Sequence, residues 1–227
     1  MTGGFGDNSN EPLIIFDCDG VLIESEAIYI EVDQRILAEF GWHLERDEII
    51  ERFVGKSHEH FVGVVETHLG HALPKDWESS HAHLYREACI QGLLPVDGIV
   101  EALDAISMAN CIASNGRHET MHFTLGLTGL FDRFDGRIFS ASDVPRAKPA
   151  PDLFLHAASK LGHHPANCVV VEDSPSGVEA ALSAGMKVIA YAAGVTPKER
   201  LTGEGVTLIG HMSELPHAIN QLLTRNF

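Results

Sequence analysis

The hydrophobic pattern changes its period along the chain, and each change marks an expected boundary between structural units. Residues 12–16 form a short apolar run behind a breaker, a pattern typical of a buried strand in a parallel sheet. Residues 24–92 instead carry apolar positions at helical spacing and show no strand signal. From residue 99 onward, short β-branched runs alternate with helical segments, which indicates a parallel sheet covered by helices on both faces.

The boundaries of these elements follow from glycines, prolines and the apolar spacing. In the helical stretch we expect helices at 24–40, 46–53, 58–69 and 75–89. In the alternating stretch we expect strands at 111–114, 137–140, 168–171, 187–191 and, at an edge, 207–209. The helices between them are expected at 99–108, 119–127, 151–161, 175–184 and 216–223. The sequence therefore predicts an α/β core of residues 1–23 and 94–227, interrupted by a helical unit of residues 24–93.

The composition limits the kind of protein this can be and the kinds of partner it can bind. The 227 residues are 44% hydrophobic and 21% charged, as expected for a globular protein. A formal net charge of −16 disfavours nucleic acid and anionic membranes as partners. No stretch has the length and apolarity of a signal peptide or a membrane span. Four cysteines without short paired spacing indicate buried free thiols, so we expect a cytoplasmic protein. A monomer is the default expectation, and residues 1–11 are expected to be a disordered tail.

Two acidic residues, Asp17 and Asp19, follow the first expected strand, at the edge where open α/β sheets bind ligands. Gly20 permits the bend that would turn both side chains toward one point. Two carboxylates held close together repel, which indicates a cation between them or a shared proton. A turn rich in Asp and Gly explains the same residues equally well. This stretch alone leaves both interpretations open.

Two later stretches also place polar residues beside a helix start. Ser114 and Asn115 end a strand and precede a helix, which suits an anion site, although on this stretch alone a helix cap is the better explanation. Lys148 is followed by two prolines, at positions 149 and 151, that stiffen its segment. A lysine fixed there can neutralise part of an acid cluster and pair with a phosphate oxygen. A solvated surface lysine is the competing interpretation.

Glu172 and Asp173 form a second acid pair, again between a buried strand and a helix. Beside Asp17 and Asp19 they would place four carboxylates in one crevice. Such a group requires a divalent cation, and oxygen ligands of this type suit Mg²⁺. Asp173 or its neighbour Ser174 can cap the following helix at the same time.

Taken in order, these stretches resemble the motifs of the haloacid dehalogenase superfamily of phosphatases. The matching residues are Asp17-Cys18-Asp19-Gly20-Val21, Ser114-Asn115, Lys148-Pro149 and Glu172-Asp173. The chain looks most like the subgroup with a helical cap inserted after the first strand, which includes the β-phosphoglucomutase-like sugar phosphatases. The resemblance covers the chain after Glu11. It implies a Rossmann-like core with strand order 5-4-1-2-3 and a cap formed by residues 24–93.

The resemblance also implies a role for each matching residue. Asp17 is similar to the nucleophile, and Asp19 to the general acid/base whose backbone carbonyl reaches the metal. Lys148 belongs to the catalytic set and also binds phosphate. The other expected phosphate or substrate contacts are Ser114, Asn115, Gly20 and the cap residues Lys56, Ser57 and His58. The expected Mg²⁺ ligands are Asp17, Asp19, Asp173 and, through a water ligand of the metal, Glu172.

The implied activity is Mg²⁺-dependent hydrolysis of a small sugar or sugar-acid phosphate through an aspartyl-phosphate intermediate. A β-phosphoglucomutase-type phosphosugar mutase is one alternative. Tyr29 stands where those mutases carry a His, and Gly55-Lys56-Ser57-His58 lacks their cap-loop Arg, so we favour hydrolysis.

Other protein classes fit less well. A non-catalytic phosphate-ligand binding protein on the same fold is disfavoured because no expected motif residue is missing. The acid at Asp19 disfavours a true dehalogenase or a phosphonatase. The helical unit and the motif order disfavour an Asp-phosphorylated signalling receiver.

Overall fold

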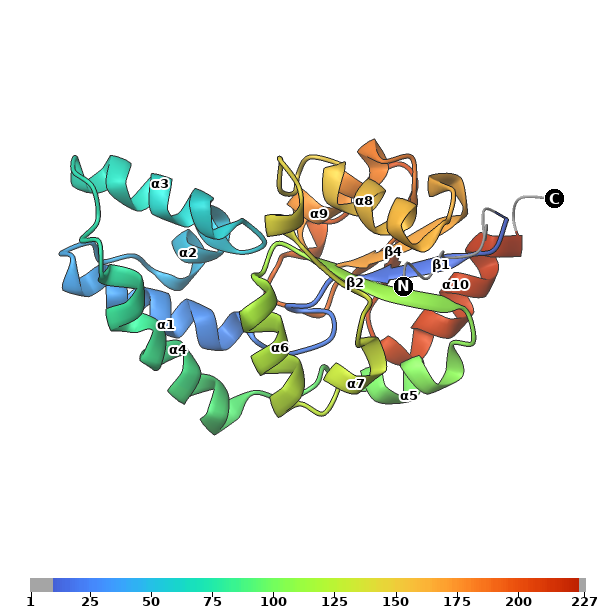
Figure 1. Ribbon diagram of the computed structural model, residues 1–227, viewed down its shortest axis with the longest axis horizontal. Helices are drawn as coiled ribbons and strands as arrows, with labels where there is room; N and C mark the ends of the chain where they lie inside the picture. The colour runs from blue at the N-terminus through green and yellow to red at the C-terminus, as the bar shows by residue number, and fades with distance from the viewer. Residues whose placement is uncertain (1–9, 225–227) are drawn as a thin grey trace, which may run out of the picture.

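A computed structural model describes residues 10–224 and shows a sheet with its flanking helices beside a separate group of four helices (Figure 1). The strands are β1 (Leu13–Phe16), β2 (Ala109–Ser114), β3 (Ile138–Ser140), β4 (Cys168–Glu172), β5 (Lys187–Tyr191) and β6 (Val206–Ile209). All pair in parallel, in the order β3-β2-β1-β4-β5-β6. This confirms the expected order 5-4-1-2-3, and β6 is the expected edge strand.

The central strand β1 is buried on both faces, which explains its unbroken apolar run. Ile14 and Phe16 point into one hydrophobic cluster, and Leu13 and Ile15 into the other. Helices α8 (Asp152–Leu161) and α9 (Pro175–Ser183) cover the face of Leu13 and Ile15. The opposite face is covered by α5 (Ile99–Ala105), α6 (His118–Leu127), α7 (Phe131–Phe134) and α10 (Leu215–Thr224).

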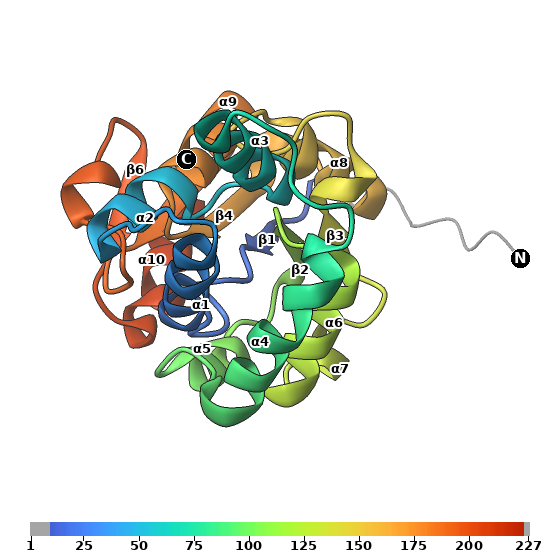
Figure 2. The same ribbon diagram turned by 90° about the vertical axis from the view of Figure 1, so that its left-hand side faces the viewer.

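The helical unit lies at the carboxyl end of the sheet and has a hydrophobic core of its own. It consists of α1 (Glu26–Glu39), α2 (Arg46–Phe53), α3 (His58–Leu69) and α4 (Trp77–Gly92) (Figure 2). Its core is formed by Ile30, Leu37, Ile49, Phe53 and Val65, among others. That residues 24–93 form a cap domain is a proposal, which we take up below.

The remaining differences from the expected elements are small. β2 begins at Ala109 rather than at residue 111, and α7 has only four residues, too few for a helical period to appear in the sequence. All four cysteines are buried and free, with Cys111 and Cys168 in strands as expected. Residues 1–9 of the expected tail lie outside the described residues. Within residues 10–224, no helix has the length and apolarity needed to cross a membrane.

Candidate active site

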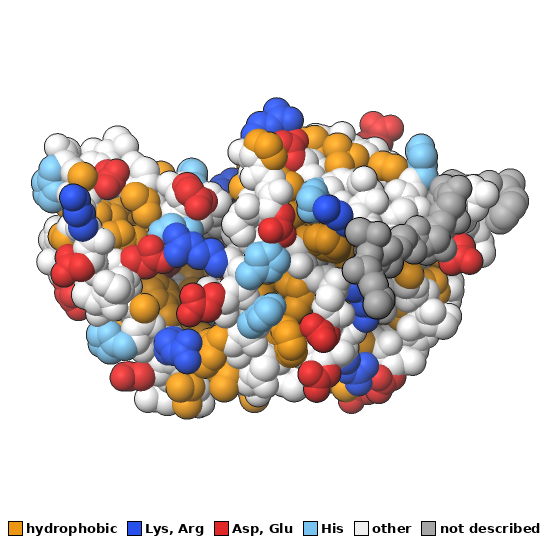
Figure 3. All heavy atoms as spheres, viewed as in Figure 1, with side chains coloured by type: hydrophobic (Ala, Val, Ile, Leu, Met, Phe, Trp, Pro, Cys, Tyr) orange, Lys and Arg blue, Asp and Glu red, His pale blue; other side chains and the backbone are white. Residues whose placement is uncertain are grey.

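The carboxyl ends of β1, β2 and β4 open into one pocket between the sheet and the helical unit. β1 lies between the other two strands, with Phe16 opposite Ile112 on one side and Val171 on the other. The residues that follow each strand therefore meet at the same edge. The pocket is a cavity of about 400 Å³ lined from both parts of the molecule. Charged side chains of both signs gather where these parts meet (Figure 3).

Lys148 joins two acids at the bottom of the pocket. Its Nζ lies 2.7 Å from Oδ1 of Asp17 and 2.7 Å from Oε1 of Glu172, and all three side chains are buried. Burial raises the pKa of Asp17 to about 7, because the loss of solvent outweighs the neighbouring ammonium. Burial alone would lower the pKa of Lys148, but its two carboxylate partners hold that pKa above its ordinary value.

Both carboxylate oxygens of Glu172 have hydrogen-bond partners. Its second oxygen, Oε2, accepts hydrogen bonds from the amides of Asp173 and Ser174 at 2.9 and 3.0 Å and from the Ser174 hydroxyl at 2.9 Å. Ser174 also caps α9 by accepting from the amide of Gly177 at 3.1 Å. A Cβ at Gly177 would lie only 1.7 Å from Oε1 of Glu172, so the helix can start this close only with glycine.

Three acids at this edge form a group that suits a divalent cation. Asp17, Glu172 and Asp173 each offer an oxygen within 4.8 Å of the others. Oδ2 of Asp173 is buried and has no hydrogen-bond partner among the described residues. Burial, and then the charges of Glu26 and Glu172, raise the pKa of Asp173 well above its usual range. A buried oxygen without a partner inside an all-carboxylate set is what Mg²⁺ coordination would satisfy, so the residues present fit this ion.

Glu26 adds a further carboxylate that we did not expect from the sequence. It lies in the first turn of α1, is buried, and stands close enough to Asp173 for its charge to raise the pKa of that acid; burial raises the pKa of Glu26 itself to about 8. Gly20, at φ +76°, lets the loop pass beside this pair, since a Cβ there would lie 1.9 Å from Oδ2 of Asp173. In the sequence Glu26 has the pattern of an ordinary acid at a helix start, and nothing in its spacing points to Asp173.

Asp19 lies in the same pocket as Asp17 but has a different partner. The Ser25 hydroxyl donates a hydrogen bond to Oδ1 of Asp19. Burial raises the pKa of Asp19, and the Ser25 hydrogen bond only partly offsets this effect. The two acids therefore stand in different environments, one paired with an ammonium and one with a hydroxyl.

Asn115 links three loops around the pocket. Its side chain accepts from the amide of Lys148 at 3.1 Å and donates to the carbonyls of Lys148 and Gly55, each at 3.3 Å. Ser176 of α9 donates to the same Gly55 carbonyl at 2.6 Å. The expected phosphate residue Ser114 accepts from the amide of Gly116 at 3.1 Å and lines the pocket. The loop between α2 and α3 is thus held against α9 and the residue that follows β2.

Comparison with known proteins assigns this arrangement to a family. The profile of the haloacid dehalogenase-like hydrolases matches residues 12–185. The chain belongs to this hydrolase family. A 6-phosphogluconate phosphatase of Escherichia coli is 31% identical over 207 residues, which cover 89% of this chain and 92% of that protein. A probable pseudouridine-5'-phosphatase of Drosophila melanogaster is 33% identical over 201 residues, covering 84% and 83%.

A solved structure of the same family agrees with the fold. A conserved haloacid dehalogenase-like protein of unknown function from Agrobacterium tumefaciens is 35% identical, with a TM-score of 0.78, and the match covers 94% of this chain and 99% of that one. The family resemblance inferred from the motifs is therefore confirmed. The protein is an enzyme of the phosphatase class, a phosphoric monoester hydrolase.

In this hydrolase the expected cap residues Lys56, Ser57 and His58 all line the pocket. Ser57 caps α3 by accepting from the amide of His60 at 3.3 Å. The ring of His58 stacks on Trp77 at 5.7 Å, and its Nε2 lies 3.4 Å from Glu78. The roles of these three residues in substrate binding remain predictions.

Sequence reasoning missed an ion pair across the pocket mouth, between Arg117 before α6 and Glu78 of α4. These residues are 39 positions apart and belong to no motif. Only the relative placement of the two parts of the molecule brings them together. Both side chains line the pocket that holds the acid cluster.

Proposed function

We propose that this protein is a Mg²⁺-dependent phosphatase that hydrolyses a small sugar or sugar-acid phosphate through an aspartyl-phosphate on Asp17. The observation that carries the proposal is the contact of 2.7 Å between Lys148 Nζ and Asp17 Oδ1 at the bottom of a pocket. The contact sets a buried carboxylate beside a fixed positive charge, and a phosphate ester needs such a charge before a carboxylate can approach it, which supports Asp17 as the nucleophile. The relative named 6-phosphogluconate phosphatase supports a sugar-acid phosphate as substrate.

The proposed metal ligands are Asp17, Asp173, the backbone carbonyl of Asp19 and, through water, Glu172. When bound, Mg²⁺ would supply positive charge to the phosphoryl oxygens and relieve the repulsion among the acids. Glu172 is in addition a positioning residue, because its two oxygens hold Lys148 and the loop of Asp173 and Ser174. The negative charge of Glu26 beside Asp173 adds to the repulsion that a bound cation would relieve.

The chain's own residues divide the reaction into two displacements. Asp17 attacks phosphorus, the bond from phosphorus to the ester oxygen breaks, and Asp19 gives its proton to the leaving alcohol. Asp19 then takes a proton from the water that attacks the aspartyl-phosphate, which releases inorganic phosphate and regenerates Asp17. Ser25 keeps the Asp19 carboxyl in place through its hydrogen bond. Lys148 and Ser114, with the loop of Gly20 after β1 and Asn115 after β2, hold the phosphoryl group.

The helical unit supplies the rest of the pocket, so we propose that residues 24–93 act as a cap that excludes bulk water during the first step. Lys56, Ser57 and His58 then meet the part of the substrate that leaves.

The test is phosphate release from a panel of phosphate esters, with Mg²⁺ and with a chelator. Release from small sugar phosphates that requires Mg²⁺ supports the proposal. No release from any ester would overturn it in favour of a binding protein.

A further inference from the structure

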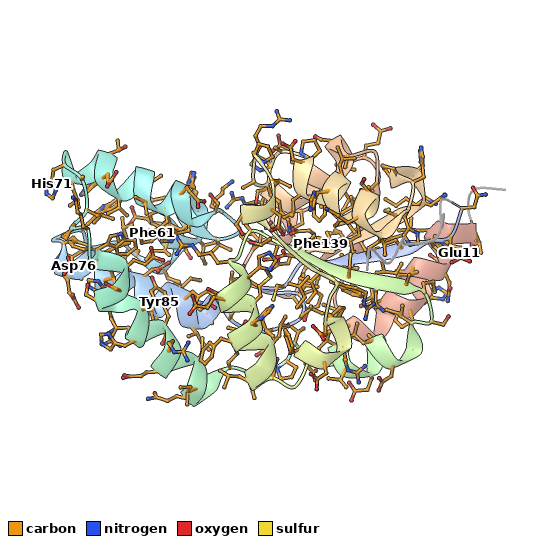
Figure 4. The ribbon with its side chains drawn as sticks, viewed as in Figure 1. Glu11, Phe61, His71, Asp76, Tyr85 and Phe139 are labelled. Carbon is orange, nitrogen blue, oxygen red and sulfur yellow. The ribbon has the colours of Figure 1, made fainter. Side chains whose placement is uncertain are left out.

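The wall of the pocket formed by the helical unit carries a carboxylate that the proposed reaction does not use. Asp33 lies on α1, one turn beyond Tyr29, and lines the same cavity as Asp17. The hydroxyl of Tyr85, on α4, donates to Oδ1 of Asp33 at 2.5 Å. No Lys, Arg or His within residues 10–224 forms an ion pair with Asp33. Tyr85 and the neighbouring pocket residue Phe61 come from different helices of this unit (Figure 4).

A second polar group on this wall also lacks a partner. The hydroxyl of Tyr29 is buried and makes no hydrogen bond to any described residue. Its ring packs edge-on against Tyr85, with the centroids 5.8 Å apart. Asp33 is half-buried, and the hydrogen bond from Tyr85 reaches only its Oδ1, so Oδ2 is free to accept another at the cavity wall; burial raises the pKa of this carboxyl to about 7. A buried hydroxyl without a partner is costly, so the Tyr29 hydroxyl beside this carboxyl indicates that a ligand or water completes the wall.

The surroundings determine which ligand chemistry fits. A carboxylate oxygen accepts hydrogen bonds, and a tyrosine hydroxyl can accept or donate, which suits the hydroxyl groups of a polyol. The aromatic rings of Tyr29, Tyr85, Phe61 and Trp77 line the cavity nearby and offer faces for the C–H surface of a sugar. An anionic group would be repelled by Asp33, which forms no ion pair with any of the lysine and arginine residues of the lining, Lys56, Arg86, Arg117 and Lys148.

From this arrangement we propose that Asp33, held by Tyr85 and flanked by Tyr29, is a specificity residue that accepts hydrogen bonds from substrate hydroxyls. The leaving group is therefore a polyol or sugar whose hydroxylated part extends toward α1 and α4, while its phosphate lies at Asp17. This inference rests on the proposed phosphatase function and narrows its substrate class.

The experiment compares kcat/KM for three kinds of phosphate ester in the full chain with Mg²⁺. These are hydroxylated esters such as glucose 6-phosphate and sorbitol 6-phosphate, butyl phosphate without hydroxyls, and glucosamine 6-phosphate with an amine. The variant Asp33→Asn keeps the side-chain size and an oxygen for Tyr85, but it removes the carboxylate. We expect the ratio of kcat/KM for the best hydroxylated ester over butyl phosphate to fall at least about tenfold.

Matched controls separate binding from folding. Glu31→Gln removes an acid from the exposed side of the same helix and should leave the ratio unchanged. Tyr85→Phe removes the hydroxyl that holds Asp33 and should lower the ratio by a smaller factor. If a thermal melt shows that Asp33→Asn is not folded, the ratio of kcat/KM measured with Tyr85→Phe decides the test.

The possible outcomes are distinct. A fall that is equal for all esters, or no fall, overturns the specificity role and leaves the phosphatase standing. A wild-type preference for glucosamine 6-phosphate that Asp33→Asn abolishes makes the wall a cation site and overturns the polyol assignment. No phosphate release from any ester by the wild type overturns the proposed function and this inference together.

Discussion

The ammonium nitrogen of Lys148 lies 2.7 Å from Oδ1 of Asp17, and neither side chain has appreciable contact with solvent. The contact leaves the carboxylate paired but still open to the pocket, since Asp17 lines the cavity. A nucleophile needs this combination of a fixed position and a free face.

We therefore expect Asp17→Asn to lose turnover by at least about a thousandfold, or roughly 4 kcal/mol of barrier. The amide nearly preserves size and can still accept a hydrogen bond from Lys148, but it cannot form the phosphoenzyme. Phosphate-release kinetics measure the loss, and a thermal melt shows that the fold is intact. Turnover within tenfold of wild type would exclude Asp17 as the nucleophile.

Lys148→Met should destabilise the protein even in the absence of metal. The substitution leaves Asp17 and Glu172 buried without their cation, and breaking a buried pair in this way costs about 3–5 kcal/mol. The free energy of unfolding from urea titrations at pH 8 measures the effect. The control is Arg146→Met, which removes a pair with Asp152 whose arginine is 70% exposed and should change little. If the two substitutions lowered the free energy of unfolding equally, the buried pair would contribute no more to stability than the exposed one.

Several of the pocket residues that the sequence predicted stand at strand ends. Asp17, Ser114 and Glu172 each end or follow an apolar strand, and parallel strands bring such residues to one edge whatever the details of packing. The fold class follows from the alternation of strands and helices, whereas the strand order came from the resemblance to the haloacid dehalogenase superfamily.

The acids of the helical unit could not be predicted in this way. Asp33 and Tyr85 are 52 positions apart on two helices, and their contact depends on how α1 packs against α4. A helical pattern shows which face is apolar but not which residue of another helix it meets. Glu26 was not predicted either. Its position in the first turn of a helix already explained its charge, and its approach to Asp173 depends on how α1 is placed.

Mg²⁺ should raise the melting temperature of the wild type, because binding to the native state alone stabilises it by about 2.7 kcal/mol at a hundredfold excess over Kd. The same titration with Asp173→Ala should give little or no shift, since this variant removes the buried oxygen that lacks a partner. Glu31→Gln is the matched control and should keep the full shift. An equal shift in Asp173→Ala would place the metal elsewhere.

The stability of Asp33→Asn relative to wild type should depend on pH. Burial raises the pKa of Asp33 from 3.8 to about 7, so the folded protein holds a proton that the unfolded chain releases. The wild type therefore loses stability as the pH rises from about 4 to about 7, whereas the asparagine does not titrate. Between pH 5 and 8, the free energy of unfolding of Asp33→Asn should therefore rise relative to that of the wild type by on the order of a few kcal/mol. Urea unfolding at four pH values checks the trend, and a constant difference would contradict it.

The last prediction concerns hydrolysis against phosphoryl transfer between sugars. A mutase must keep its phosphoenzyme until a second hydroxyl arrives and must hold the phosphate that stays on the substrate. The position that carries a His in the mutases is Tyr29 here, and burial raises the pKa of its hydroxyl further above its usual range, so it is a poor proton relay.

The pocket also lacks the cap-loop arginine that holds the retained phosphate in the mutases. Arg117 is already paired with Glu78, and the loop after Gly55 carries Lys56 instead of an arginine. We therefore expect β-glucose 1-phosphate to give free phosphate and no isomerised sugar, with or without the 1,6-bisphosphate. Glucose 6-phosphate appearing faster than inorganic phosphate, and only with the bisphosphate, would establish the mutase instead. If hydrolysis prevails, Tyr29→His should shift the partition toward transfer, because an imidazole at that position can hold and release a proton near neutral pH.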